Sequence, residues 1–469
     1  MRFEKLFKMR YTLLIVLLFC GSLSTVFASS TSQEHTEEEK SVEAKALEKF
    51  TKGLTIPVGG KSYFKYGIGA QTWFRSGEMN PGTLNSNTKE PTSYVNDFAM
   101  RRLRLLAYSN IENKYFIFTQ IGITSHPTDG TAHQPIFVHD FWGKIRLGNT
   151  NNFIGAGQHM FMGLSRLSLV SYWRTNTLDN PSFNFPQVNV TDDFVRQMGV
   201  FFQGMTGRFK YMASVNQPFQ PSNSSKILTK EELASRKVAD QAFNLRTADL
   251  SYNAYLEYHF FTKEKPGFTP FNTMSHLGRK GRFLNLGAGF RYDGGAMGYI
   301  EEGSDFSAEN VKTTGSLATA IDLFYEEPMA KGAVLNLYGA FYRFDYGPNY
   351  LNTIGVMNPG ISDGSALPQG AGISQYYLGT GNVGYLNAAY ILPFTIGEVG
   401  RLQPWAALQY KDFEGLKDAS MQYDIGMHYL IVGHNIKLSM AYSTRPIYNE
   451  NMELDSSKGL FITQMQFRF

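Results

Sequence analysis

The 469-residue chain contains one cysteine, Cys20, and it lies close to the N-terminus. If the chain is cleaved after Ala28, the mature protein has no thiol at all. This excludes a disulfide framework, a cysteine nucleophile and a thiolate metal site. The formal net charge is only +4, so charge alone implies no nucleic-acid partner.

Long apolar runs are also missing after the N-terminal segment. A membrane-spanning helix needs about 20 apolar residues, and no later stretch provides them. The mean hydropathy is slightly negative. A membrane β-barrel would have such a sequence, because lipid-facing and lumen-facing residues alternate along each strand and cancel in any average. The 37 phenylalanines and 27 tyrosines fit the aromatic girdles of such a barrel.

The N-terminal segment predicts a secretory signal peptide over residues 1–28. Four basic residues precede a short apolar stretch, Tyr11–Cys20, and Val26–Ala28 offers small residues for cleavage. The basic residues are Arg2, Lys5, Lys8 and Arg10. A lipoprotein cleaved before Cys20 is the alternative, although the bulky Phe19 suits it poorly. Residues 29–58 are polar and predict a periplasmic arm, either mobile or helical.

The C-terminus ends in a strand with one apolar and one polar face. This pattern predicts the closing strand of a membrane β-barrel, with Phe469 as its assembly signal. An ordinary half-buried strand of a soluble sandwich is the alternative. The apolar face carries Phe461, Met465, Phe467 and Phe469, and the polar face carries Gln464, Gln466 and Arg468.

Strand-like segments of about 9–13 residues recur through residues 59–469 and predict a single all-β, antiparallel transmembrane barrel of about 16 strands. Short and long connections alternate, which is typical of short periplasmic turns and long extracellular loops. A soluble sandwich has no reason to sort its loops in this way. One link departs from the rule, because Phe261–Arg282 falls on the short-turn side and yet is long.

The charged residues predict how a pore would be lined. The loop at 161–193 is expected to fold inward and narrow the lumen. Alternation places Arg102, Arg104, Lys144 and Arg146 inward on the wall beside this loop, which itself carries Arg166 and Arg174. Acidic residues face the lumen from later strands, so the two sets would face each other and create a transverse field that selects ions. The alternative is that these charges pair along the wall. The basic set is Arg102, Arg104, Lys144, Arg146, Arg166 and Arg174, and the acidic set is Glu257, Asp322, Glu326 and Asp424.

Four short motifs resemble outer-membrane porins of the phosphate-selective porin superfamily. The resemblance implies a sixteen-stranded, usually trimeric, diffusion channel. The third long loop departs from the phosphate-selective members, because it has no obvious lysine cluster. The motifs are Phe98–Leu105, Phe153–Gln158, Gly163–Leu167 and Thr177–Pro181.

These features together predict a bacterial outer-membrane porin for small hydrophilic solutes and ions. Its partners would be membrane lipid, the barrel-assembly machinery and two further copies of the chain in a homotrimer. A substrate-specific channel for phosphate or polyphosphate is the alternative, and a barrel enzyme or surface-binding protein is the remote one. No cofactor or metal is expected, since the spacing of His126, His133 and His139 matches no known ligand pattern.

Overall fold

The computed structural model describes residues 42–126, 136–161, 163–186, 195–218, 240–267, 269, 271–397 and 399–469. The predicted signal peptide and His133 lie outside the described residues. None of the helices in the described ranges has the length and apolar character required to cross a membrane.

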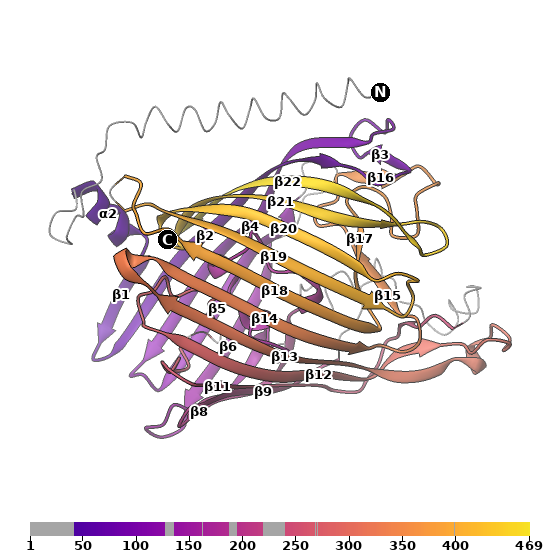
Figure 1. Ribbon diagram of the computed structural model, residues 1–469. Helices are drawn as coiled ribbons and strands as arrows, with labels where there is room; N and C mark the ends of the chain where they lie inside the picture. The colour runs from indigo at the N-terminus through magenta and orange to yellow at the C-terminus, as the bar shows by residue number, and fades with distance from the viewer. Residues whose placement is uncertain are drawn as a thin grey trace.

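The chain folds into a closed, antiparallel, 16-stranded β-barrel, which confirms the predicted fold class (Figure 1). Each strand pairs with the next one along the chain, and β22 pairs with β2 to close the ring. The barrel strands are β2 (Ser62–Glu78), β4 (Tyr94–Ile111), β5 (Tyr115–His126), β6 (Phe137–Arg146), β7 (Phe153–His159), β8 (Gln197–Thr206), β9 (Phe209–Asn216), β11 (Ser251–His259), β12 (Phe283–Tyr299), β13 (Lys312–Pro328), β14 (Val334–Asp345), β18 (Gly381–Ile391), β19 (Arg401–Phe413), β20 (Ser420–Val432), β21 (Ile436–Tyr448) and β22 (Leu454–Arg468).

The last strand closes the barrel, as its alternation predicts. The register runs from Gly69 opposite Arg468 to Gly77 opposite Leu460. Beyond it, Phe469 and Ile68 exchange two backbone hydrogen bonds of 2.8 and 3.1 Å. The Phe469 ring also packs against Phe50 of helix α2 (Val42–Phe50), with 4.8 Å between the ring centroids. The C-terminal residue is therefore part of the junction between β2 and β22 that closes the barrel, which we call the seam.

The outer face of the barrel is apolar. Strand β11 shows the alternation, because Tyr252 and Leu256 are exposed while Asn253 and Glu257 are buried in the lumen. Since exposed apolar side chains recur on nearly every strand, the outer surface suits lipid rather than water. Other exposed apolar residues include Phe64, Ile68, Leu105, Ile117, Phe141, Ile154, Val200, Leu286, Ile321, Phe341, Leu386, Ile425 and Phe467. The soluble-sandwich alternative is wrong.

The two rims differ, as the connection lengths predict. One rim carries tight turns, and we call it the short rim; α2, the C-terminus and β1 (Leu54–Gly59) lie there (Figure 1). Helix α2 and all of β1 except Gly59 fall within residues 29–58, which were expected to form an arm, and β1 pairs with β2. The long rim carries the remaining short strands, which are β3 (Thr83–Asn85), β10 (Phe243–Asn244), β15 (Leu351–Ile354), β16 (Gly360–Ser362) and β17 (Gln375–Gly379).

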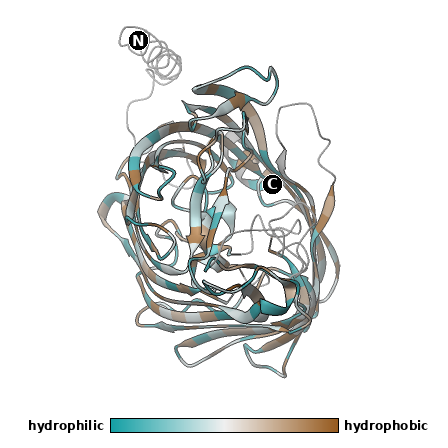
Figure 2. Ribbon diagram, turned by 90° about the vertical axis from the view of Figure 1, so that its right-hand side faces the viewer, coloured by the Kyte–Doolittle hydropathy of each residue, from teal (hydrophilic) through white to brown (hydrophobic). Residues whose placement is uncertain are grey.

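Two segments of the chain, one from each rim, extend into the lumen, and Figure 2 shows ribbon inside the ring of strands. The first segment follows β7, and we call its described part, residues 163–186, the inward loop. The second is the long link on the short rim, residues 260–282, which we call the short-rim insert. The two meet in a parallel bridge between Val170 and Asn272. The inward loop contains η1 (Leu167–Leu169), η2 (Tyr172–Arg174) and η3 (Ser182–Asn184).

Candidate functional site in the barrel lumen

The inward loop lies against the barrel wall because small residues allow a close approach. Gly163 has a φ of +61°, in the left-handed region that glycine tolerates best. Its carbonyl oxygen lies 2.1 Å from the position that a Cβ atom would take at Gly289 on β12. A side chain at residue 289 would therefore push the loop off the wall.

One end of the inward loop is held by a pair of arginines on β4. Asp179 lies 2.8 Å from Arg101 Nε and 2.8 Å from Arg102 Nη2. Burial alone would raise the pKa of Asp179, but the charges of Arg102 and Arg101 outweigh burial and lower it to about 2. This loop carboxylate is therefore ionised at neutral pH.

Both arginines reach the lumen because β4 contains a bulge. Gln71 on β2 faces Arg102, whereas the next residue, Thr72, faces Met100. Arg101 is the extra residue, so the alternation changes phase there. The sequence pattern correctly places Arg102 and Arg104 inward, but it misses Arg101, because a strict period of two assigns Arg101 to the lipid face.

The middle of the inward loop is held by Tyr172. Its hydroxyl group accepts hydrogen bonds from Arg104 Nε at 3.2 Å and from Gln120 Nε2 at 3.1 Å. The guanidinium of Arg102 lies over the Tyr172 ring, 4.5 Å from its centroid, in a cation–π contact. Arg104 also donates to the backbone carbonyls of Leu103 and Ile123. The two predicted arginines thus position the loop.

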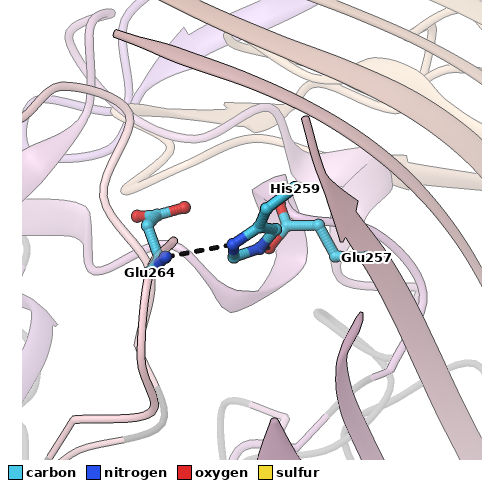
Figure 3. Close-up of side chains that lie close together, drawn as sticks. All are labelled: Glu257, His259 and Glu264. Carbon is cyan, nitrogen blue, oxygen red and sulfur yellow. Dashed lines mark hydrogen bonds and ion pairs between the residues drawn. The ribbon is translucent and has the colours of Figure 1, made fainter. Parts of the chain in front are cut away.

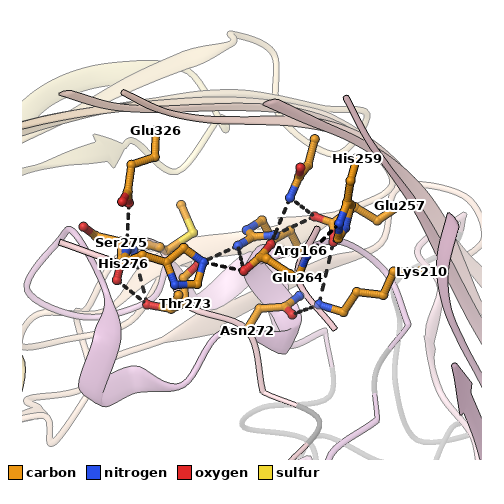
Figure 4. Close-up of polar contacts among 12 residues, drawn as sticks. Arg166, Lys210, Glu257, His259, Glu264, Asn272, Thr273, Ser275, His276 and Glu326 are labelled. Atoms are coloured by element: carbon orange, nitrogen blue, oxygen red, sulfur yellow. Dashed lines mark hydrogen bonds and ion pairs between the residues drawn. The ribbon is translucent and has the colours of Figure 1, made fainter. Parts of the chain in front are cut away.

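Arg166 joins the inward loop to the short-rim insert, as Figure 4 shows. Its Nη1 atom lies 2.6 Å from Glu257 Oε1 on β11 and 2.6 Å from Glu264 Oε2 on the insert. Its Nη2 atom binds Glu264 Oε1 at 3.0 Å and the Thr273 carbonyl at 2.8 Å. Burial opposes the ionised form of Glu264, yet the charge of Arg166 holds the pKa of Glu264 well below its usual range.

Backbone hydrogen bonds also join the two segments. Asn272 N–H donates to the Leu169 carbonyl at 2.8 Å, and Ser171 N–H donates to the Asn272 carbonyl at 3.2 Å. Met274 N–H donates to the Arg174 carbonyl at 3.1 Å. The insert is held to the wall as well, because Glu326 on β13 accepts from the backbone N–H of His276 at 2.7 Å. These contacts explain the single long link on the short-turn side.

Three side chains in this region have the geometry of a metal site. The ligand atoms of Glu257, His259 and Glu264 lie within 4.8 Å of one another (Figure 3). His259 Nδ1 accepts from the Glu264 backbone N–H at 3.0 Å, so Nε2 carries the proton and donates to Glu257 Oε2 at 2.9 Å. Arg166 and Lys210, whose Nζ lies 3.8 Å from Glu257, already balance the two carboxylates. We therefore assign an ion-pair cluster here, not a metal site.

The other predicted lumen residues take separate positions. Lys144 Nζ donates to the Gly267 carbonyl of the insert at 2.7 Å. Arg146 is the last residue of β6, at the short rim, where its Nε donates to the Asn113 carbonyl of a neighbouring turn at 2.8 Å. Asp322 accepts from the Arg166 backbone N–H at 2.6 Å. Asp424 accepts from Gln409 Nε2 at 2.9 Å.

The basic and acidic sets were expected to face each other across water. Arg166 and Glu257 are instead in direct contact, which corrects that expectation for this pair. Pairing, which the sequence left open as the alternative, is what the structure shows here. Sequence reasoning missed Glu264 and His276. The one sequence feature that pointed to these residues was the unusual length of the link that contains them. A long connection on the short-turn side can be accommodated inside the barrel.

In the part of the chain that the structure describes, two larger cavities lie beside the inward segments: one is lined by both segments and the wall, and the other by the inward loop and the wall. The short-rim cavity has a volume of about 560 Å³, and its lining includes Lys65, Arg174, Gln203 and Arg468. The long-rim cavity has a volume of about 170 Å³, and its lining includes Asp424. Of the ten predicted charged lumen residues, Arg174 and Asp424 line these cavities. The remaining eight lie in the surrounding hydrogen-bond networks.

No family model matches the sequence. No curated protein matches it at the threshold of significance. Among solved structures, Pseudomonas putida OprB at high pH aligns with a TM-score of 0.51 and 9% identity, over 87% of this chain and 94% of that one. Salmonella typhi OmpF in complex with daunomycin aligns with a TM-score of 0.50 and 9% identity, over 89% of this chain and 100% of that one.

At this identity the similarity concerns the fold. A closed 16-stranded barrel with an apolar outer face matches these two structures in architecture. The protein is a β-barrel of the bacterial outer membrane. The resemblance to the phosphate-selective superfamily remains a prediction.

Proposed function

We propose that this barrel is a porin through which small hydrophilic solutes and ions diffuse passively. The observation that carries the proposal is the contrast between its two faces. The outer face is apolar, whereas the lumen holds two cavities lined by charged and polar side chains. A polar path inside an apolar cylinder is the arrangement that lets polar solutes cross a lipid bilayer.

The inward segments would set the size limit of this path. Both lie inside the barrel and bind its wall, so the free cross-section is much smaller than the ring of strands. We expect a low conductance and exclusion of large solutes. In this proposal Arg102, Arg104, Lys144, Arg146 and Arg166 act mainly by positioning, while Arg174 and Asp424 contact the solute.

Planar-bilayer recording tests the proposal. Purified, folded protein should insert with stepwise increases in current, and the steps should have a uniform size. Folded protein that leaves bilayers electrically silent would contradict it and would favour the surface-binding alternative. The trimeric state is part of the same proposal, and chemical cross-linking in native membranes tests it separately.

A substrate-specific anion channel remains the second candidate, and one observation favours it. The inward loop has no lysine cluster, but the short-rim insert brings Lys263, Lys265 and Lys280 to the same cavity as Lys65. Saturable block of chloride current by millimolar phosphate would support this candidate over a general porin. The enzyme alternative gains no support, because the buried carboxylate of Glu257 is already paired with Arg166 and Lys210.

A further inference from the structure

The short-rim cavity carries a large excess of positive charge. Glu264 is the acidic residue in its lining, and this carboxylate already binds Arg166 and His276. The cationic residues that line the cavity are Lys65, Arg174, Lys210, Lys263, Lys265, Lys280 and Arg468.

Most of this charge is uncompensated within the described residues. Lys210 lies near Glu257, but the other six cationic residues form no ion pair with any described residue. They also repel one another. Burial, together with the charge of Arg468, lowers the pKa of Arg174 to about 10, so Arg174 remains charged at neutral pH. An anion in this cavity would gain from several cations at once.

Two buried amides in the same lining have unused hydrogen-bonding capacity. Gln203 on β8 is 2% exposed, and neither its amide nitrogen nor its amide oxygen has a partner among the described residues. The Nδ2 atom of Asn272 is also without a partner there. Leaving a buried polar group without a hydrogen-bond partner is unfavourable. An anion without a hydroxyl group, such as chloride or sulfate, would satisfy the donors but leave the Gln203 oxygen without a donor.

The shape and remaining lining favour an organic ligand. The volume of about 560 Å³ falls within the roughly 300–1,000 Å³ typical of small-molecule sites. Tyr63, Tyr108, Tyr211 and Phe271 provide aromatic surface beside the cations. Aromatic rings next to amides form a common setting for ligands that combine a ring with hydroxyl groups.

We propose that the short-rim cavity binds a small organic anion that carries hydroxyl groups, such as an acidic sugar. The carboxylate would lie among Lys65, Lys280 and Arg174, and the hydroxyl groups would pair with Gln203 and Asn272. This inference rests on the proposed function, since it makes the cavity a binding site on the path that solutes take through the barrel.

Calorimetric titration of the full-length protein in detergent at low salt tests the inference, with glucuronate as the probe. Cyclohexanecarboxylate has the charge and a six-membered ring without hydroxyl groups, and glucose has the hydroxyl groups without the charge. We expect glucuronate to bind at least about tenfold more tightly than either compound or inorganic sulfate, because only glucuronate uses both sets of contacts. Equal binding of glucuronate and any of these three compounds would overturn the proposal.

Two sets of variants locate the binding. Lys65→Gln with Lys280→Gln should weaken glucuronate binding by at least about tenfold. Lys114→Gln with Lys331→Gln removes the same charge from the same rim outside the cavity lining and should leave binding unchanged. Gln203→Leu should abolish the preference for glucuronate over cyclohexanecarboxylate. Equal effects of the two lysine pairs, or a retained preference in Gln203→Leu, would overturn the proposal.

The titration and the bilayer recording fail independently. Protein that conducts ions but binds no glucuronate would overturn this inference and leave the porin intact. Protein that binds glucuronate but never conducts would overturn the porin and leave the binding site as that of a receptor.

Discussion

Arg166 and Glu264 form a bidentate ion pair between two segments that enter the barrel from opposite rims, with contacts of 2.6 and 3.0 Å. Glu257 on the wall shares the same guanidinium. This arrangement ties the inward loop, the short-rim insert and strand β11 together at one point. Arg166 is therefore the side chain that connects all three elements directly.

Replacing Arg166 with methionine should loosen this junction. The change leaves Glu257 and Glu264 buried without their main counter-charge, and loss of one partner from a buried pair costs about 3–5 kcal/mol. We expect lower resistance to urea unfolding in lipid vesicles and larger, noisier conductance steps. Arg282→Met is the matched control, because it breaks the exposed pair with Glu327. An effect of Arg166→Met no larger than that of this control would contradict the assignment.

The contacts of Asp179 predict how stability depends on pH. Its pKa is about 2 in the folded protein and about 3.9 in an unfolded chain. Because the folded value is the lower one, the pair stabilises the protein above about pH 4 and loses this contribution as the pH falls toward 2. The contribution is about 3 kcal/mol.

Asp179→Asn tests that window. Urea unfolding should show a clear difference between wild type and variant at pH 7, which shrinks between pH 5 and pH 2. A difference that stays constant across this range would mean that the carboxylate charge is not what holds the loop. Asp305→Asn, in an exposed loop, serves as the control and should show no such trend.

The two cavities predict the selectivity of the pore. Lys65→Gln with Arg174→Gln should move the reversal potential toward cations, since both residues line the short-rim cavity. Arg146→Gln should leave it nearly unchanged, because Arg146 lies at the short rim, bound to a neighbouring turn. Reversal potentials in a salt gradient provide the measurement. A larger shift from Arg146→Gln would contradict this prediction, because it would show that the selective charges lie outside the short-rim cavity.

The seam predicts the role of the last residue. Deleting Phe469 removes two backbone hydrogen bonds to Ile68 and the contact with Phe50. We expect a several-fold smaller fraction of heat-modifiable, folded protein in the membrane. Phe50→Ala removes only the ring contact and should assemble nearly normally. Normal assembly after deletion of Phe469 would show that the seam forms without it.

Much of the barrel could be predicted from the sequence because strand alternation is a local property. The closing strand and the inward position of Arg102 and Arg104 follow from a period of two residues. The bulge at Arg101 could not be predicted, because one inserted residue changes the phase without any marker in the sequence.

The lumen was less predictable because its contacts join distant segments. Arg166 and Glu264 are separated by 98 residues, and no local pattern specifies which carboxylate meets which arginine. The lysines of the short-rim cavity come from β2, β9 and the insert, so they form a cluster only after folding. The length of the link at 261–282 was the one signal that this region was unusual.

Single-channel recording of the wild type beside a variant without the tip of the insert tests the central claim most directly. In that variant a short Gly-Ser turn replaces residues 263–274, and migration on unheated gels verifies that the barrel is folded. The account predicts small, uniform steps for the wild type and clearly larger steps for the variant, because the insert occupies the lumen. Equal step sizes, or silent bilayers from folded wild-type protein, would contradict it.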